Sequence, residues 1–238
     1  MAQTTYKVTG RWGPVTYFSK DEYVGASLRY YGEYNPDETE MVLSLAQPDK
    51  LCLDIGANCG VIAQALEFSG FEVQCFEPQP EVAKVCAENV RGMVHACGLG
   101  DVEMMAPMPK LDYSAKNNIG GMGLNMRSVL GTITVPVKTL DSFNFQNVGF
   151  IKMDVEGFEL QVLQGGRETI LREKPIMYIE DDRMEKSYAL RKYIQELGYT
   201  IEQHKPRLYR EQNFFGLKKN IWGREYASHN LICRPLDA

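Results

Sequence analysis

The sequence predicts an α/β fold in which a mostly parallel sheet is covered by helices on both faces. Three observations carry this prediction. Short apolar runs alternate with amphipathic segments from residue 50 onward, a glycine-containing turn follows the first apolar run, and an acidic residue follows the second. Short strands separated by helices are typical of a parallel sheet, because each parallel pair needs a crossover connection.

The individual elements follow from apolar periodicity and from turn residues at their ends. Strands are expected at Leu51–Ile55, Phe71–Phe76, Met93–Cys97, Val148–Met153 and Pro175–Ile179, with a late edge strand at Leu231–Cys233. Helices are expected at 37–46, Val61–Phe68, Pro80–Val90, 158–172 and 184–197. Residues 4–18 predict two short strands around the turn Trp12-Gly13-Pro14.

Two segments stand apart from this alternation. Residues 110–127 are rich in Gly and Asn, which predicts a mobile loop that closes over a ligand or, equally, a plain surface excursion. Residues 1–30 predict an N-terminal extension, which either forms a cap over the site where a substrate binds or only packs on the sheet. The main domain is then residues 31–238.

Composition narrows the class of protein. The chain of 238 residues has a net charge of −5, which disfavours duplex nucleic acid as a partner. Its six cysteines form no Cys-x-x-Cys pair, and no apolar run approaches the ~20 residues of a membrane span. We expect a cytoplasmic protein that does not bind membranes, and the sequence leaves its oligomeric state open. The basic and aromatic stretch from Lys205 to Lys219 is interpreted as a solvated loop.

The strongest motif is the turn after the first strand. Its expected cofactor-binding residues are Asp54, Gly56, Ala57, Asn58 and Gly60. Glycines there allow a tight turn and close approach of a ligand to the backbone. A dinucleotide site would carry glycine where Asn58 stands. S-adenosylmethionine has no phosphate, and an acid suits its ammonium while backbone N–H groups suit its carboxylate.

The next two strand ends extend this site. Glu77 ends the second strand about 20 residues after the turn, where an acid accepts hydrogen bonds from ribose hydroxyls. Pro78 follows it directly. Cys97 and Gly98 end the third strand, and small residues at that place leave room for a flat adenine ring.

These motifs together resemble the FkbM-type methyltransferases. The resemblance rests on Leu53–Gly60, Phe76-Glu77-Pro78 and Ile151–Glu159, and it extends to Thr139–Ser142, Val162–Gly166 and Asn230–Pro235. It implies a Rossmann-like class I methyltransferase fold, S-adenosylmethionine as methyl donor, and a hydroxyl acceptor on a sugar, glycan or small metabolite. It also implies a glutamate ahead of the first strand that contacts the methionine end of the donor, and by spacing this is Glu38.

Three residues at the end of the fourth strand are the catalytic candidates. A hydroxyl is a poor nucleophile and needs a base, so we assign Asp154 first, and then Glu156, as base or acceptor-orienting group. Lys152 lies two residues before Asp154 and so on the same side of the strand, where it would keep Asp154 ionised. A purely structural Lys152–Asp154 ion pair is the competing interpretation.

Other functions remain open at this point. Asp154 with Glu180-Asp181-Asp182 would offer oxygen ligands to Mg²⁺, although acidic loop residues are commonly just solvated, and no metal ligand is assigned. An NAD(P)-dependent oxidoreductase or epimerase would explain the pattern Tyr188-x-x-x-Lys192. Methylation of an RNA ribose is disfavoured because Glu180 stands where such an enzyme would want a lysine.

Overall fold

The central layer of the computed structural model is a twisted sheet, and the structure describes residues 4–124, 126, 128–223 and 228–236. Within these residues, seven strands follow the order β11 (Tyr199–His204), β12 (Asn230–Pro235), β10 (Ile176–Glu180), β9 (Val148–Met153), β3 (Leu51–Ile55), β4 (Glu72–Phe76), β5 (Val94–His95). The strands from β10 to β5 are parallel, and β12 is antiparallel to both β10 and β11. The predicted α/β class with a mostly parallel sheet is confirmed.

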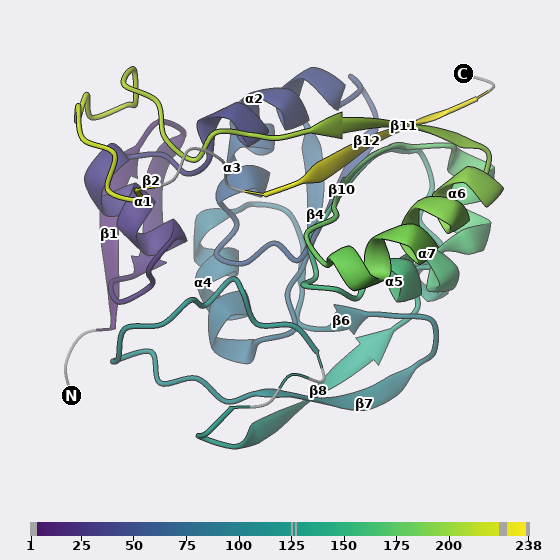
Figure 1. Ribbon diagram of the computed structural model, residues 1–238, viewed down its shortest axis with the longest axis horizontal. Helices are drawn as coiled ribbons and strands as arrows, with labels where there is room; N and C mark the ends of the chain where they lie inside the picture. Colours follow the sequence, from purple (N-terminus) through teal and green to yellow (C-terminus); the bar gives the residue numbers. More distant parts are fainter. Residues whose placement is uncertain (1–3, 125, 127, 224–227, 237–238) are drawn as a thin grey trace.

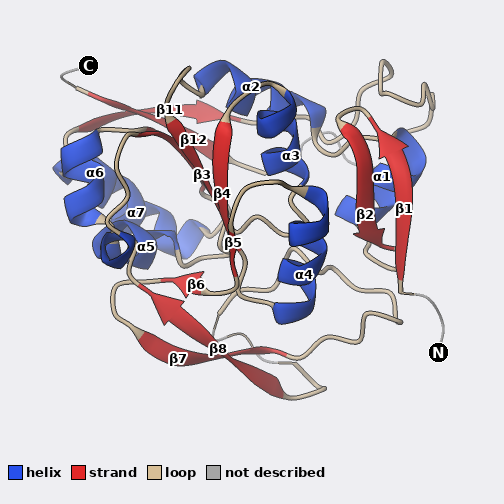
Figure 2. Cartoon of the chain, turned by 180° about the vertical axis from the view of Figure 1, so that it is seen from behind, coloured by secondary structure: helices blue, strands red, loops and turns tan. Residues whose placement is uncertain are grey.

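Helices cover both faces of this sheet (Figures 1 and 2). One face carries α2 (Pro36–Leu45), α3 (Val61–Phe68) and α4 (Pro80–Asn89), and the other carries α5 (Glu159–Gly165), α6 (Arg167–Glu173) and α7 (Met184–Glu196). In the part of the chain that the structure describes, none of these helices has both the length and the apolar character needed to cross a bilayer.

Alternation along the strands builds the two cores. In β3, Leu53 and Ile55 face the α5–α7 layer, whereas Cys52 faces α2 and α3. In β9, Ile151 faces the α5–α7 layer, whereas Phe150 faces α2 and α3. Because side chains alternate with a period of two, Asp54 and Lys152 must lie on the α2 side of the sheet.

The N-terminal region is a separate small unit. It consists of β1 (Thr5–Gly10), β2 (Gly13–Phe18) and α1 (Val24–Tyr31), of which the hairpin agrees with the prediction for residues 4–18. The unit packs on helices rather than on the sheet. Asn89 in α4 exchanges hydrogen bonds with the backbone of Thr16 in β2, both 2.7 Å long, and Gln64 in α3 donates to the Pro14 carbonyl at 2.7 Å.

A second, three-stranded sheet lies below the first in Figure 1 and was not foreseen from the sequence. It contains β6 (Gly98–Leu99), β8 (Thr132–Lys138) and β7 (Met104–Pro109) in that order. Its presence corrects the prediction of one strand over Met93–Cys97. That stretch forms only the two-residue β5, and the chain then turns at Cys97 and joins the second sheet at Gly98.

Two further predictions are wrong in detail. The single helix predicted over 158–172 is divided into α5 and α6 at the adjacent residues Gly165 and Gly166, and a Cβ on Gly165 would lie 1.9 Å from the Gly100 carbonyl oxygen. Asp141, from the short helical turn Asp141–Phe143, accepts the Thr169 N–H at 2.8 Å and so caps α6. The edge strand predicted at Leu231–Cys233 is β12, which lies inside the sheet, and β11 is the edge.

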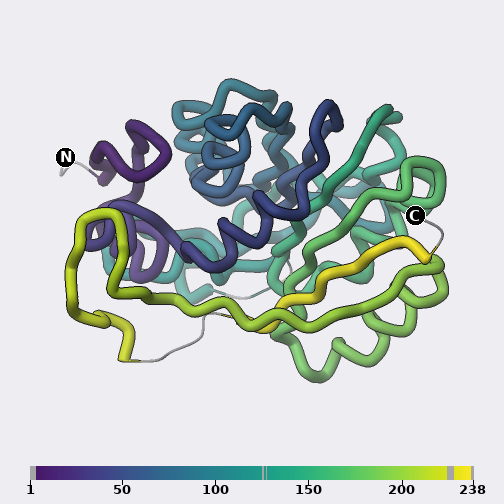
Figure 3. The backbone as a smooth tube through the Cα atoms, turned by 90° about the horizontal axis from the view of Figure 1, so that it is seen from above, coloured from purple at the N-terminus to yellow at the C-terminus, as the bar shows by residue number. Residues whose placement is uncertain are grey.

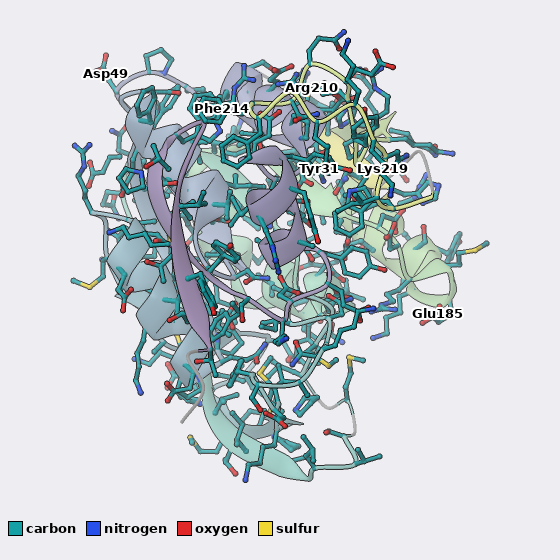
Figure 4. The ribbon with its side chains drawn as sticks, turned by 90° about the vertical axis from the view of Figure 1, so that its left-hand side faces the viewer. Tyr31, Asp49, Glu185, Arg210, Phe214 and Lys219 are labelled. Carbon is teal, nitrogen blue, oxygen red and sulfur yellow. The ribbon has the colours of Figure 1, made fainter. Side chains whose placement is uncertain are left out.

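The segment after β11 crosses to the N-terminal unit, as the view from above shows (Figure 3). Arg207 pairs with Asp37 at 2.7 Å, and Arg210 pairs with Glu40 at 2.6 Å and with Glu33 at 3.5 Å. Arg210, Phe214, Tyr31 and Lys219 lie near one another on this side of the molecule (Figure 4). The arginines of the predicted solvated loop are therefore neutralised within the chain.

The turn between β3 and α3 passes directly under the end of β9. Gly56 has φ 82°, and a Cβ there would lie 1.7 Å from the Asp154 carbonyl oxygen. Gly60 has φ 79°, and its Cβ would lie 2.9 Å from Cys86 Sγ in α4. We expected these glycines to admit a ligand. In the structure, each is required by a close approach of the protein itself.

Gly56→Ala should therefore destabilise the protein by about 2–5 kcal/mol, the combined cost of overpacking and a left-handed alanine. Gly70 is the matched control, because it has φ 93° but an added Cβ would meet nothing within 4 Å. Gly70→Ala should cost only ~1–2 kcal/mol. Urea denaturation measures both, and equal losses would contradict the steric argument.

Candidate functional site

Charged side chains gather where three neighbouring parallel strands end. Asp54 on β3 pairs in register with Lys152 on β9, and Lys152 pairs with Tyr178 two residues before Glu180 on β10. All three charged residues lie on the α2 side of the sheet by strand alternation. The carboxyl edge of an open parallel sheet is where ligands bind in such folds.

Lys152 is the centre of this group. Its side chain is 6% exposed, and its Nζ lies 3.7 Å from Asp54 Oδ1 and 3.5 Å from Asp154 Oδ2. Burial by itself lowers the pKa of Lys152, but the carboxylates of Asp154, Asp54 and Glu38 outweigh that effect and raise it above its ordinary value. Lys152 is therefore a permanent cation between two carboxylates.

Asp54 and Asp154 differ in exposure. Asp54 is 1% exposed, and neither of its carboxylate oxygens accepts a hydrogen bond from a described residue. Burial raises the pKa of Asp54, and the Lys152 ammonium opposes that rise. The Asp154 side chain is 35% exposed, and its Oδ1 likewise has no hydrogen-bonding partner among the described residues. Both residues line the same cavity.

Glu38 reaches this group from the first turn of α2, as the sequence predicted by spacing. It is buried and accepts a short hydrogen bond from the side-chain amide of Asn35. Burial raises the pKa of Glu38 to about 7, with Lys152 opposing the rise and Asp154 adding to it. Glu38 thus titrates near neutrality while it faces the cavity.

Glu77 is held by the backbone on both sides. Its Oε2 accepts the Asn58 N–H at 3.1 Å, and its Oε1 accepts the Gln79 N–H at 2.8 Å. Burial raises the pKa of Glu77 to about 7, against the effect of these two hydrogen bonds. Each oxygen keeps a further lone pair, so the carboxylate can accept two more hydrogen bonds from a ligand in the cavity.

Beside Glu77, small residues border one end of the cavity. Pro78, Cys97 and Gly98, which the sequence predicted to bind the donor, all line it. A Cβ on Gly98 would lie 3.2 Å from Leu124 Cδ1 and 3.7 Å from Pro78 Cβ. Gly98 therefore packs closely against Leu124 and Pro78 at this end of the cavity.

A second set of acids lies beyond Asp154. Single carboxylate oxygens of Asp154, Glu156 and Glu180 come within 4.8 Å of one another. Burial, and secondarily Asp154, raises the pKa of Glu156 to about 7, although Glu156 forms a short ion pair with Arg183. Asp181 is directed elsewhere, because it binds Arg191 at 2.7 Å.

These residues enclose a cavity of about 460 Å³. Several residues that the sequence did not mark also line it, including Tyr34, Met108, Ile119, Leu124 and Arg183. Segment 118–124 thus borders the cavity, whereas Asn125 and Arg127 of the predicted loop lie outside the described residues. Tyr34 and Arg183 carried no local signal, since only the fold brings them to the strand ends.

The features that suggested a dehydrogenase do not reach the cavity. Tyr188 is 80% exposed, and Lys192 pairs with Glu196 one helical turn away on α7. Neither of them is among the residues that line the cavity. The Tyr-x-x-x-Lys pattern is therefore an exposed helix face.

The fold and the site together define a Rossmann-like protein of the class I methyltransferase type. The chain belongs to the FkbM methyltransferase family, whose methyltransferase FkbM domain matches residues 54–215. The 2-O-methyltransferase NoeI of Sinorhizobium fredii (strain NBRC 101917 / NGR234) is 29% identical, over 56% of this chain and 64% of its own length. The match thus spans slightly less than two thirds of that relative.

Solved structures share the fold at low sequence identity. The methyltransferase FkbM from Methylobacillus flagellatus KT is 19% identical with a TM-score of 0.52, over 89% of this chain and 55% of its own. The Pyrococcus abyssi tRNA (uracil-54, C5)-methyltransferase, in complex with S-adenosyl-L-homocysteine, is 12% identical with a TM-score of 0.54. The match covers 98% of this chain and 45% of that protein.

The raised pKa of Glu38 makes stability depend on pH. The folded protein keeps this proton up to about pH 7, whereas an unfolded glutamate loses it near pH ~4.3. The contribution of Glu38 to the free energy of unfolding is therefore full at low pH and falls as pH rises through 7. Relative to Glu38→Gln, the wild type should lose about 3 kcal/mol between pH ~4.5 and ~8 in urea denaturation. A constant difference between the two proteins would contradict this expectation.

Proposed function

We propose that the protein is an S-adenosylmethionine-dependent O-methyltransferase that acts on a hydroxyl of a sugar, glycan or small metabolite. The observation that carries the proposal is Asp154, a 35% exposed carboxylate at the end of β9 whose Oδ2 lies 3.5 Å from the Lys152 ammonium. It opens into the same cavity as Glu77 and the glycine turn.

The residues present fit the methyl donor. Asp54 and Glu38 are buried acids that line the cavity, and the carboxylate of Asp54, beside the Lys152 ammonium, suits the ammonium of the donor's methionine end. The free lone pairs of Glu77 suit a ribose diol. The space between Pro78, Cys97 and Gly98 suits adenine. Gly56, Ala57 and Asn58 line the bend between these parts, whereas Gly60, also predicted to bind the donor, does not line the cavity.

The chain's own chemistry is to orient a hydroxyl and remove its proton. S-adenosylmethionine, when bound, supplies a methyl group activated by a sulfonium. Asp154 accepts the proton of the acceptor hydroxyl, since a carboxylate within hydrogen-bonding distance can act as general base. The Lys152 ammonium, 3.5 Å from Asp154 Oδ2, holds this carboxylate in position. Glu156, fixed by Arg183, lies on the acceptor side and can receive a second hydroxyl of the same molecule.

The acceptor class rests on two arguments. The relative NoeI is named a 2-O-methyltransferase, which supports transfer to oxygen. A nucleic acid acceptor is disfavoured because Arg207 and Arg210 are paired with Asp37, Glu33 and Glu40. A small polyhydroxyl compound needs no basic surface, and Asp154, Glu156 and Glu180 line the cavity with carboxylates that can accept hydrogen bonds from its hydroxyls.

We propose a reaction without Mg²⁺. Asp154, Glu156 and Glu180 would offer the oxygen ligands that this ion prefers. However, Lys152 already lies beside Asp154, and Arg183 already pairs with Glu156. A divalent cation would have to compete with these two cations for the same carboxylates.

Binding of the donor's product form tests the cofactor assignment. Glu77→Ala should weaken uptake of S-adenosylhomocysteine about 10- to 100-fold in isothermal calorimetry, because two hydrogen bonds to a charged acceptor are lost. Glu81→Ala removes an exposed carboxylate from the first turn of α4 and should bind like the wild type. Absence of uptake by the wild type, or equal affinity of Glu77→Ala, would refute the assignment.

Turnover tests the assignment of the base. A screen of hydroxylated glycans and metabolites with labelled S-adenosylmethionine identifies an accepted compound. Asp154→Asn should then lower kcat by about 10²–10⁴-fold, the range typical of a lost general base. Affinity for S-adenosylhomocysteine should stay within about threefold, since Asp154 is assigned to the acceptor. Undiminished kcat in Asp154→Asn would show that another group takes the proton.

A further inference from the structure

Residues 118–124, here called the roof segment, lie directly against the strand ends that form the site. A Cβ on Gly120 would lie 2.8 Å from Asn58 Nδ2 in the glycine turn, and one on Gly123 would lie 2.7 Å from the Glu156 carbonyl oxygen. Leu124 lies against Gly98. The roof segment therefore touches the ends of three different parts of the site, and its glycines allow that close approach.

Two side chains from different parts of the chain hold the roof segment at Ile119. The Ile119 N–H donates to Asp21 Oδ1 at 3.2 Å, and the Ile119 carbonyl accepts from Gln79 Nε2 at 3.3 Å. The Ile119 side chain is 1% exposed. Both backbone groups of one buried residue are thus satisfied by side chains, which fixes the roof segment at this point.

Asp21 brings the N-terminal unit into this arrangement. Its carboxylate accepts the Gly25 N–H at 2.8 Å at the start of α1 as well as the Ile119 N–H. Next to it, the Glu22 N–H donates to the Asn117 carbonyl at 2.9 Å, and the Asn117 N–H donates to the Lys20 carbonyl at 3.2 Å. The N-terminal unit therefore supports the roof segment from outside.

Gln79 is the only described residue that hydrogen-bonds to both Glu77 and the roof segment. It is 3% exposed, and its backbone N–H donates to Glu77 Oε1 at 2.8 Å while its side chain donates to Ile119. Its Oε1 also accepts the Tyr113 hydroxyl at 3.2 Å, just ahead of the roof segment. One residue thus joins the carboxylate assigned to the ribose and the segment that borders the cavity.

We propose that Gln79 is a positioning residue that couples occupancy of the Glu77 end of the cavity to closure of the roof segment. The proposal rests on the proposed function, because it takes an adenosyl compound as the ligand. If a bound ligand raises the equilibrium constant for closure of the roof segment by some factor, closure must raise the affinity for that ligand by the same factor. Weakening the Gln79–Ile119 contact should then lower affinity without altering any group assigned to contact the ligand.

The test compares two buried glutamines that bind backbone carbonyls. Gln79→Met removes the donor to Ile119 but keeps the backbone N–H that holds Glu77. Gln64→Met is the control for loss of a buried donor, because Gln64 is 9% exposed, donates to Pro14 at 2.7 Å and, unlike Gln79, does not line the cavity. For each protein we would measure the melting temperature, affinity for S-adenosylhomocysteine by calorimetry, and hydrogen exchange of amides 118–124 with and without that ligand.

Gln79→Met should bind about tenfold more weakly, the loss expected for one buried hydrogen bond. It should also lose the ligand-induced protection of amides 118–124. Gln64→Met should lower the melting temperature but keep wild-type affinity and protection. Wild-type affinity and protection in Gln79→Met would overturn the coupling and leave the proposed function standing. Failure of the wild type to bind would overturn the proposed function, and the coupling with it.

Discussion

The buried ammonium of Lys152 is the interaction on which the arrangement of the site depends. An isolated lysine at this depth would lose its proton or destabilise the fold, and an isolated Asp54 would gain a proton or destabilise it. The register of β3 and β9 places the two residues side by side, and the end of β9 adds Asp154. Each charge makes the burial of the others tolerable. This compensation allows Asp54 to face the cavity, where an unpaired buried carboxylate would be strongly destabilising.

The parts of the site predicted from the sequence are those fixed by local pattern. Asp54, Glu77 and Asp154 each follow a short apolar run, so recognising the strand was enough to place the residue at the edge of the sheet. Gly56 and Gly60 marked the turn between strand and helix. The reason for those glycines could not be read locally, because the atoms that would clash with a side chain come from β9 and α4.

The parts that could not be predicted depend on distant contacts or on locally unfavourable residues. Strand β7 contains Pro107 and Pro109, which normally argue against a strand. Helix α1 includes Gly25, has no acidic residue in its first turn, and takes its support from Asp21. The division between α5 and α6 falls at Gly165 and Gly166, where the chain passes close to the Gly100 backbone. The anchor of the roof segment joins Asp21 to Ile119, which are 98 positions apart in the chain.

The position of β12 has a consequence for how the sheet can assemble. Because β12 lies between β10 and β11, neither of those strands has its neighbour on that side until residues 230–235 have been synthesised. Before residues 230–235 are added, β11 has no hydrogen-bonding partner in the sheet, and both of its edges are exposed. On the ribosome, the sheet should therefore close in one late step, and a chain interrupted before that step would carry an open edge available to aggregation.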